Sequence, residues 1–310
     1  MGTDTVDESL LLAARFEEHR AHLQAVAYRM LGSISEAEDA VQDTWLRFDR
    51  TDTSDVENLG GWLTTVAARV CLNLLRSRET RREDSLDESR EPGGSRMPDP
   101  LITRGEVIDP EQEVLLADSV GLALMVVLES LAPAERLAFV LHDMFAVPFD
   151  EIATLLDKTP AATRQLASRA RRRVQGQAPP PDPDLTRQRQ VVNAFFAATR
   201  DGDFEALVAV LDPDVVLRSD GGVARSGLTV VLNGARTVAG QAVTFSSVAP
   251  FARPALINGA AGVTVVVEGR PMSIMAFIVA DGKILAIDVI ADPHRLRGFG
   301  LADADADAGI

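Results

Sequence analysis

The side chains best suited to bind another molecule lie between residues 159 and 174, in the sequence TPAATRQLASRARRRV, which contains five arginines. Guanidinium groups form paired hydrogen bonds with phosphate oxygens. The chain as a whole carries a formal net charge of -15, and such a charge opposes general attraction to nucleic acid. The arginine-rich segment therefore predicts a local contact with nucleic acid, made by one short part of an acidic protein.

The residues before this segment predict that it is the second helix of a helix-turn-helix. The sequence FDEIATLLDK gives a first helix, and Thr159 can cap a second helix that has Pro160 in its first position. The apolar residues expected to face inward are Phe149, Ile152, Ala153, Leu156, Leu166, Ala167, Ala170 and Val174. The polar side chains expected on the outside, which are our DNA-binding candidates, are Thr163, Arg164, Gln165, Ser168, Arg169, Arg171 and Arg172. Such a helix would read base edges near its start and contact phosphates later, and the alternative is a solvated basic helix end.

A second polar stripe is expected on the helix predicted for GGWLTTVAARVCLNLLRSR, residues 60–78. Its members, spaced by four, four and three residues, are Thr65, Arg69, Asn73 and Arg76. They can donate hydrogen bonds to bases and phosphates, or they can form an ordinary solvated face. The polar loop 49–58 before this helix could hold an unpaired base in a pocket.

The sequence SISEAEDAVQDTWLRFDR predicts an amphipathic helix with an acidic face. Ser35 and Glu38 have the spacing of a capping box, which would start the helix there. The residues expected to face inward are Ala37, Ala40, Val41, Thr44, Trp45 and Phe48. The opposite face carries Glu36, Asp39, Gln42, Asp43 and Arg47. This face is either a solvated surface or a docking surface for another protein.

Composition and charge limit the class of protein. The single cysteine, Cys71, allows no internal disulfide and suits a reducing compartment. The acidic start of the chain lacks the basic segment of a signal peptide, and there is no apolar run of about 18 residues that could span a membrane. Four histidines and one cysteine leave little to bind a metal, and no cofactor motif is visible. We therefore expect a cytoplasmic protein without metal or cofactor.

Composition also divides the chain into segments. Residues 81–112 are polar and rich in proline and glycine, which predicts a linker between two helical blocks. The sequence GQAPPPDPD, residues 176–184, predicts a stiff spacer. After it come a helical stretch and β-branched runs that end in glycine turns, which indicate an α+β domain. The final residues, LADADADAGI, are of low complexity, and we expect residues 299–310 to be disordered.

Together the two helical blocks resemble the extracytoplasmic-function sigma factors, which are bacterial RNA polymerase subunits. YRMLGSISEAEDAVQDTWLR and the helix after it resemble sigma region 2, and LAPAERLAFVLHDMFAVPFDEIATLLDKTPAATRQLASRARRRV resembles region 4. The C-terminal part resembles a SnoaL-like domain, a cone of helices on a curved sheet. The implied fold is multi-domain, with two all-α sigma domains and one α+β domain. The expected boundaries are region 2 at 8–80, a linker at 81–112, region 4 at 113–175, a spacer at 176–184, the SnoaL-like domain at 185–298 and a tail at 299–310.

The resemblance implies partners for each surface. Asp39, Gln42, Asp43 and Trp45 would dock on core RNA polymerase, although Trp45 could instead belong to the core. The stripe that begins at Thr65 would face the -10 promoter element, loop 49–58 would capture a flipped base, and helix 161–174 would read the -35 element. The linker 81–112 would thread toward the active centre of the polymerase.

The C-terminal domain resembles one that is fused to a subgroup of these sigma factors. That subgroup carries a proline motif in the linker, of which MPDP at 97–100 looks like a variant, and an Asp-Gly-Gly motif, here Asp220, Gly221 and Gly222. A later Asn-Pro-Asp motif is changed here to ADPHRL, residues 291–296. The resemblance implies that the loop at Asp220–Gly222 and the segment Asp292–Leu296, with Pro293, contact the sigma regions in the same chain and regulate them.

An alternative is that the C-terminal domain is an enzyme of the cyclase or isomerase type, or a ligand-binding module. Such chemistry needs an acid or base inside the apolar cone. The candidates are Asp288, Asp220 and His294. Asp288 alternates with Ile287 and Val289, so its side chain points either into the cone or toward solvent.

Overall fold

The computed structural model describes residues 3–53, 55–84, 97–103, 121–177 and 182–301. It divides into two compact units. The helical unit contains residues 1–88, 113–118 and 127–177, and the sheet unit contains residues 89–112, 119–126 and 178–310. Residues 97–103, which the sequence places in the linker, therefore belong to the sheet unit. No helix among the described residues is long and apolar enough to cross a membrane.

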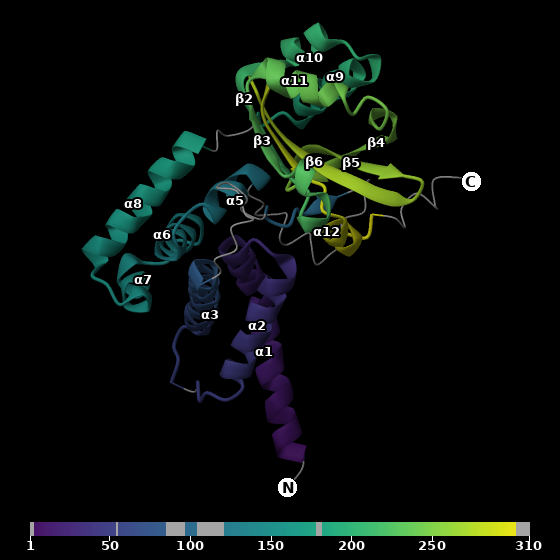
Figure 1. Cartoon of the computed structure of the whole chain (residues 1–310). Helices are drawn as coiled ribbons and strands as arrows, with labels where there is room; N and C mark the ends of the chain where they lie inside the picture. The colour runs from purple at the N-terminus through teal and green to yellow at the C-terminus, as the bar shows by residue number, and fades with distance from the viewer. Residues whose placement is uncertain (1–2, 54, 85–96, 104–120, 178–181, 302–310) are drawn as a thin grey trace. The chain divides into compact units, whose positions relative to one another are not determined.

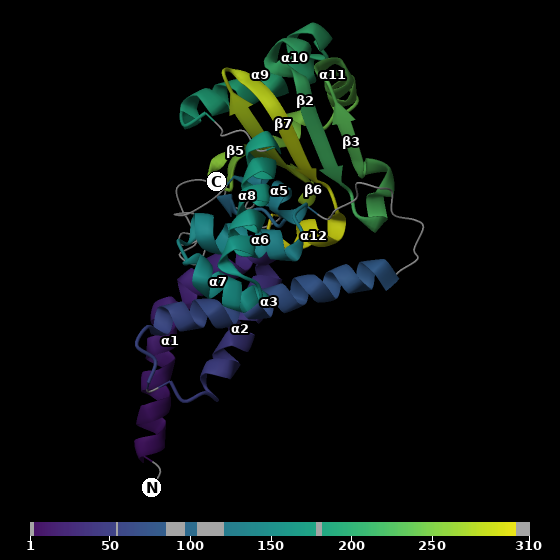
Figure 2. The same cartoon turned by 90° about the vertical axis from the view of Figure 1, so that its left-hand side faces the viewer.

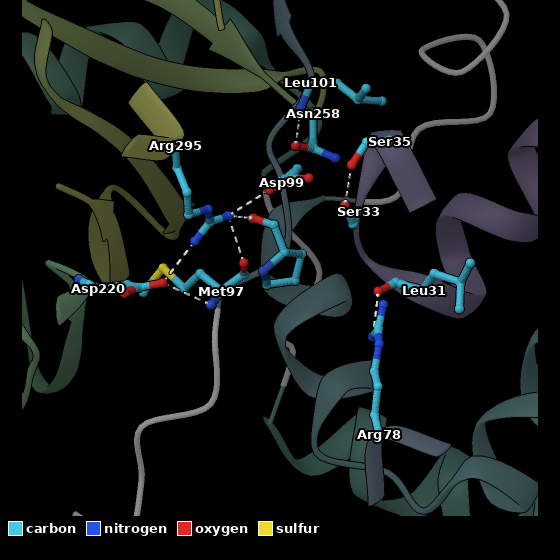
Figure 3. Close-up of polar contacts among 12 residues, drawn as sticks. Leu31, Ser33, Ser35, Arg78, Met97, Asp99, Leu101, Asp220, Asn258 and Arg295 are labelled. Atoms are coloured by element: carbon cyan, nitrogen blue, oxygen red, sulfur yellow. Dashed lines mark hydrogen bonds and ion pairs between the residues drawn. The ribbon is translucent and has the colours of Figure 1, made fainter. Parts of the chain in front are cut away.

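The first part of the helical unit is a bundle of α1 (Thr3–Leu31), α2 (Ile34–Phe48) and α3 (Leu59–Asp84). Phe16, Leu23 and Met30 of α1 are fully buried. The Phe16 ring meets the rings of Trp45 and Phe48 at 5.2 and 6.0 Å between centroids, which fixes α2 against α1. At the other end, Arg78 of α3 donates a hydrogen bond to the Leu31 carbonyl at 3.2 Å (Figure 3).

The capping box that the sequence suggested at Ser35 and Glu38 is wrong. Helix α2 begins at Ile34, so its N-cap is Ser33, whose extended backbone precedes the first turn. The Ser33 side chain makes no capping bond and instead lies 3.2 Å from the Ser35 hydroxyl. Gly32, with φ of +69°, turns the chain sharply before Ser33 and thereby sets the earlier start.

The second part of the helical unit consists of short helices. They are α5 (Leu122–Glu129), which crosses the boundary between the units, α6 (Pro133–Phe139), the π-helical turn η1 (Val140–Met144), α7 (Phe149–Leu156) and α8 (Pro160–Gln177). Asp157 takes a left-handed conformation to end α7. The Thr159 hydroxyl accepts a hydrogen bond from the Ala162 amide at 3.2 Å, as the sequence predicted for the N-cap of α8.

A buried arginine joins the two parts of the helical unit. The Arg136 side chain of α6 is 2% exposed and forms an ion pair with Glu129 at 2.8 Å. Its Nε donates to the Arg29 carbonyl in α1 at 3.1 Å. A Cβ at Gly32 would lie 2.2 Å from the Glu129 carboxylate, so only glycine fits beside this pair. The helical unit is therefore held together by a charged group that is paired on both sides.

In the sheet unit, three helices cover one face of a curved sheet (Figure 1). They are α9 (Leu185–Asp201), α10 (Phe204–Val210) and α11 (Ala235–Val243). The sequence indicated one long helical stretch here, and Gly202, with φ of +66°, ends α9 and separates it from α10. The strands are β1 (Ile102–Thr103), β2 (Leu211–Asp220), β3 (Val230–Asn233), β4 (Ala252–Ile257), β5 (Ala260–Val267), β6 (Arg270–Ala280) and β7 (Lys283–Ile290). Two 3₁₀ turns, η2 (Val223–Leu228) and η3 (Ala249–Phe251), and the last helix α12 (Pro293–Gly298) complete the unit.

The strand order is β1-β4-β5-β6-β7-β2-β3, and among the described strands only the β2–β7 pair is parallel. Figure 2 shows β2 beside β7. Three successive hairpins have two-residue turns with positive φ at both positions, the first of them at Asn258 and Gly259. The side chains between the sheet and its helices are apolar, and they include Phe195, Val263, Phe277 and Ile287. The two all-α parts and the α+β unit confirm the predicted fold class.

Candidate functional site

The linker segment that carries the MPDP sequence is part of the sheet. Ile102 and Thr103 form β1, which pairs antiparallel with β4. The Leu101 backbone amide donates to the Asn258 side-chain oxygen at 3.1 Å (Figure 3). The Asn258 backbone amide in turn donates to the Leu101 carbonyl at 2.8 Å. The Leu101 side chain is 1% exposed. A segment expected to be only a linker thus adds an edge strand to the sheet, and its backbone groups are satisfied by the C-terminal residues.

Arg295 of α12 holds the start of this segment (Figure 3). Its Nη2 donates to the carbonyls of Met97 and Pro98 at 2.7 and 3.1 Å and to the Asp99 carboxylate at 2.9 Å. Its Nη1 donates to Asp220 at 2.7 Å, and Asp220 also accepts a hydrogen bond from the Met97 amide at 3.2 Å. We call Arg295, Asp220 and the Met97–Asp99 segment the linker clamp. The Arg295 side chain is 8% exposed, so these charge-assisted bonds are shielded from water.

The loop that carries Asp220 is built around glycines. A Cβ at Gly221 would lie 2.1 Å from the Arg225 carbonyl, and Gly222 has φ of +61°. A Cβ at Gly222 would also lie 2.4 Å from the Asp292 carboxylate. Glycine at both positions therefore lets the loop close against the start of α12, which brings Asp220 to Arg295.

Helix α12 is capped by Asp292, whose carboxylate accepts a hydrogen bond from the His294 amide at 2.8 Å. Pro293 occupies the first helical position. The five residues predicted as regulatory contacts, namely Asp220, Gly221, Gly222, Asp292 and Pro293, therefore surround one site. The sequence motifs indicate the segment that contains Arg295 but do not single out Arg295, and they give no sign of the part that Asn258 plays.

The structure places Asp288, a candidate acid inside the cone, outside the cone. Its neighbour Ile287 belongs to the core under the helices, so Asp288 lies on the opposite face of the sheet. It is nevertheless 2% exposed, and Arg218 of the adjacent strand donates to it at 3.3 Å. Both orientations weighed from the sequence, into the cone or into solvent, are wrong. Burial raises the pKa of the Asp288 carboxyl, and the nearby Arg218 charge opposes that rise.

The two other acid or base candidates do not face the cone either. The Asp220 carboxylate is used by Arg295 and the Met97 amide. His294 is exposed on α12. The cone interior is lined by the apolar core, and none of the three candidates reaches it. This arrangement provides no poised acid or base among the candidates that the sequence offered.

The outer face of α8 is basic, although fewer residues lie on it than expected. Arg164, Gln165, Arg169 and Arg172 are exposed, and Ser168 is half-buried. Arg171 donates to Asp143 at 2.9 Å and thereby ties α8 to η1. Thr163 is 0% exposed and its hydroxyl donates to the Thr159 carbonyl at 3.1 Å, so the prediction that it lies outside is wrong. A Thr side chain can be buried at this position because its hydroxyl is satisfied within the helix.

The stripe predicted on α3 is largely on the surface. Arg69, Asn73 and Arg76 are exposed, and Thr65 is half-buried. In the loop before α3, Asn58 accepts a hydrogen bond from the Gly61 amide at 3.0 Å and so caps the helix. Ser54 lies outside the described residues.

The acidic face of α2 is also on the surface. Asp39 and Gln42 are exposed, and Asp43 forms a 2.9 Å ion pair with Arg47 one turn later. Trp45 is half-buried against Phe16, which favours a packing role for most of its ring. The polymerase-binding and DNA-binding roles of these residues stay predictions.

Comparison with known proteins defines the class first. Residues 15–81 match the Sigma-70 region 2 family and residues 121–174 match the Sigma-70 region 4 family, so α2, α3 and the α7–α8 pair belong to two sigma-70 regions in the usual order. The chain is 39% identical over 307 residues to the ECF RNA polymerase sigma factor SigJ of Mycobacterium tuberculosis, covering 94% of this chain and 96% of that protein. It is 35% identical over 288 residues to the probable ECF RNA polymerase sigma factor SigI of the same species, covering 92% and 94%. A crystal structure of Mycobacterium tuberculosis SigJ matches with a TM-score of 0.72 and 35% identity, over 92% of this chain and 98% of that one.

The chain belongs to the extracytoplasmic-function family of RNA polymerase sigma factors. The relatives match along nearly their whole length, so the likeness includes the sheet unit.

Asp288 gives a prediction for the dependence of stability on pH. Because its pKa is raised in the folded protein, folding is favoured when it is protonated, and this contribution is lost as pH rises through the folded pKa. Lowering the pH from neutral toward the ordinary range of an Asp should therefore stabilise the natural protein relative to Asp288→Asn. Urea unfolding of both proteins, followed by circular dichroism at several pH values, measures this difference. A difference that stays constant with pH would contradict the raised pKa.

Proposed function

We propose that this sigma factor brings core RNA polymerase to promoters through its helical unit, and that its sheet unit regulates initiation by holding the linker. We assign region 2 to residues 8–80 and region 4 to residues 113–175, with the linker 81–112 between them. The SnoaL-like domain is assigned to residues 185–298, after the spacer 176–184. The tail 299–310 falls almost wholly outside the described residues. The single observation that carries the regulatory part is the linker clamp at Arg295.

The DNA-binding part of the proposal rests on which basic side chains are available. Arg169 and Arg172 have no ion-pair or hydrogen-bond partner among the described residues and lie exposed on α8. Arg164 stands over the Phe149 ring at 5.6 Å, which positions it near the start of the helix. These side chains suit a recognition helix that reads the -35 element, whereas Arg171 and Arg173 serve to fix α8 in place.

The acidic face of α2 is the proposed contact with polymerase. Asp39 and Gln42 are exposed. Leu46 lies on the same face, one turn after Gln42, and is 43% exposed. An apolar side chain within a charged face is typical of a protein interface. The polar stripe on α3 is the proposed contact with the -10 element, because its Arg69 and Asn73 side chains are exposed.

A first experiment tests promoter recognition. Arg169→Ala should reduce run-off transcription from a promoter that depends on its -35 element by about tenfold, because a base or phosphate contact contributes about 1–3 kcal/mol. The same variant should transcribe a pre-melted template without a -35 element at the natural rate. Arg200→Ala, an exposed arginine of α9, is the matched control and should leave both templates unchanged. Equal losses by Arg169→Ala on both templates would contradict a role in -35 recognition.

The proposed regulation of initiation follows from the linker residues that the sheet unit holds. While Met97–Thr103 is bound to the sheet unit, the middle of the linker is unavailable to any other partner. Polymerase would need this segment if the linker threads toward its active centre, so it would have to release the clamp first. Only residues 178–181 separate the end of α8 from Asp182, whose amide donates to the Val279 carbonyl of β6 at 2.7 Å. This short connection gives an effective concentration of about millimolar order, so the clamp can reform after release.

We also propose that the sheet unit is not an enzyme. The support is the position of the three acid or base candidates, of which Asp288 lies on the far face of the sheet and Asp220 is part of the clamp. The third candidate, His294, is exposed on α12.

Arg295→Ala tests the regulatory proposal. Loss of the guanidinium removes four hydrogen bonds, so deuterium exchange of the peptide that contains residues 97–103 should become faster in the free protein. Run-off transcription with core polymerase should rise severalfold at limiting sigma factor, because less work is needed to free the linker. Arg297→Ala, two residues further along α12 and exposed, is the control. Faster exchange without any change in transcription would contradict regulation by the clamp.

A further inference from the structure

The sheet unit contains a cavity of about 300 Å³ next to the strand that the linker contributes. Residues of β1, β4 and β5 and one face of α9 line it. The apolar part of its lining includes Val192, Leu256 and Val263. A cavity of this size lies at the small end of the range for small-molecule sites. It is separate from the linker clamp, because none of the clamp residues lines it.

Three polar side chains that line this cavity have no hydrogen-bond or ion-pair partner within the described part of the chain. The Thr103 hydroxyl is buried and lacks a hydrogen-bond partner among the described residues. Arg189 and Asn193, one turn apart on α9, form no hydrogen bond or ion pair with any described residue, and both are exposed beside the cavity. By contrast, Arg187 on the same helix forms an ion pair with Asp182 at 2.8 Å. Buried hydroxyl groups are rarely left without a partner, so Thr103 marks a place where one is missing.

We propose that this cavity binds a small carboxylate with an apolar body, and that the ligand stabilises the linker in its docked position. Arg189 suits the carboxylate because a guanidinium forms paired bonds with its two oxygens. Asn193 supplies an amide donor at the same rim, and the apolar lining takes up the rest of the molecule. A phosphate or an unsubstituted inorganic anion would leave the apolar floor uncovered, which is why the class is an organic acid.

Coupling to the linker follows from the origin of Thr103. Because Thr103 belongs to β1, the cavity has its full lining only while the linker is docked against β4. A ligand that contacts this lining binds the docked state better than the released one, and by linkage it shifts the chain toward the docked state. This step rests on the proposed function of the clamp, whereas the existence of the binding site does not.

The experiment uses the full chain and two matched probes, octanoate and 1-octanol. Equilibrium dialysis should show saturable binding of octanoate, and 1-octanol should bind at least tenfold more weakly because it lacks the carboxylate. Arg189→Ala should weaken octanoate binding at least tenfold. Arg200→Ala, three turns further along α9 and not part of the lining, should bind octanoate as the natural protein does.

A second measurement tests the coupling. Trypsin cleaves after Arg104, the residue that follows β1, and octanoate should slow this cleavage severalfold in the natural protein and not in Arg189→Ala. Thr103→Val should keep the strand and reduce the effect of octanoate. Circular dichroism of each variant shows whether its fold is retained.

The outcomes separate the two proposals. Octanoate binding that is absent, or that is the same in Arg189→Ala, overturns the carboxylate site and leaves the clamp proposal standing. Octanoate binding that depends on Arg189 but leaves cleavage after Arg104 unchanged overturns the coupling. Binding with protection supports both parts of the inference. If the clamp variant leaves transcription unchanged, the regulatory proposal fails even when octanoate binds.

Discussion

The regulatory account depends on one buried guanidinium. Arg295 donates to two linker carbonyls and the Asp99 carboxylate with one nitrogen and to Asp220 with another. A charge removed from water is costly unless such partners are present, so the site is stable only when the linker is in place. Gly221, Gly222 and the Asp292 cap make this arrangement possible, because they let the end of β2 approach the start of α12. The helical unit uses the same device at Arg136, whose side chain bonds a carboxylate of one helix and a carbonyl of another.

Backbone recognition explains why the roles of Arg295 and Asn258 are hard to predict from sequence. Arg295 donates to the carbonyls of Met97 and Pro98, and β1 pairs through its main chain. These bonds would form with many different linker side chains, so the linker sequence records only part of the interaction, chiefly at Asp99. Proline suits this role because it offers a carbonyl and lacks an amide that would need its own partner. Asn258 likewise binds the main chain of Leu101. Its side-chain oxygen accepts from the Leu101 amide, and its backbone amide donates to the Leu101 carbonyl.

Local patterns allowed much of the fold to be predicted. The Thr159 cap, the helix pair at α7 and α8 and the glycine turns between strands each depend on neighbouring residues, and the structure confirms them. Properties that depend on distant parts of the chain were less accessible. The burial of Thr163 depends on how α8 packs, and the environment of Asp288 depends on Arg218, 70 residues away in sequence. Alternation along β7 indicated two faces correctly, but it gave no sign that the outer face is buried as well.

A reversible lock between β1 and β4 tests the central claim most directly. Ile102 and Ile257 are antiparallel partners, so cysteines at both positions in the full chain lie within disulfide range. The natural Cys71 is buried, and burial raises its pKa to about 12, so it should not interfere. Run-off transcription with core polymerase should fall strongly when the double variant is oxidised and recover when it is reduced, while each single variant responds to neither treatment. Equal transcription from the oxidised and reduced double variant would contradict the account that the linker must leave the sheet unit for initiation.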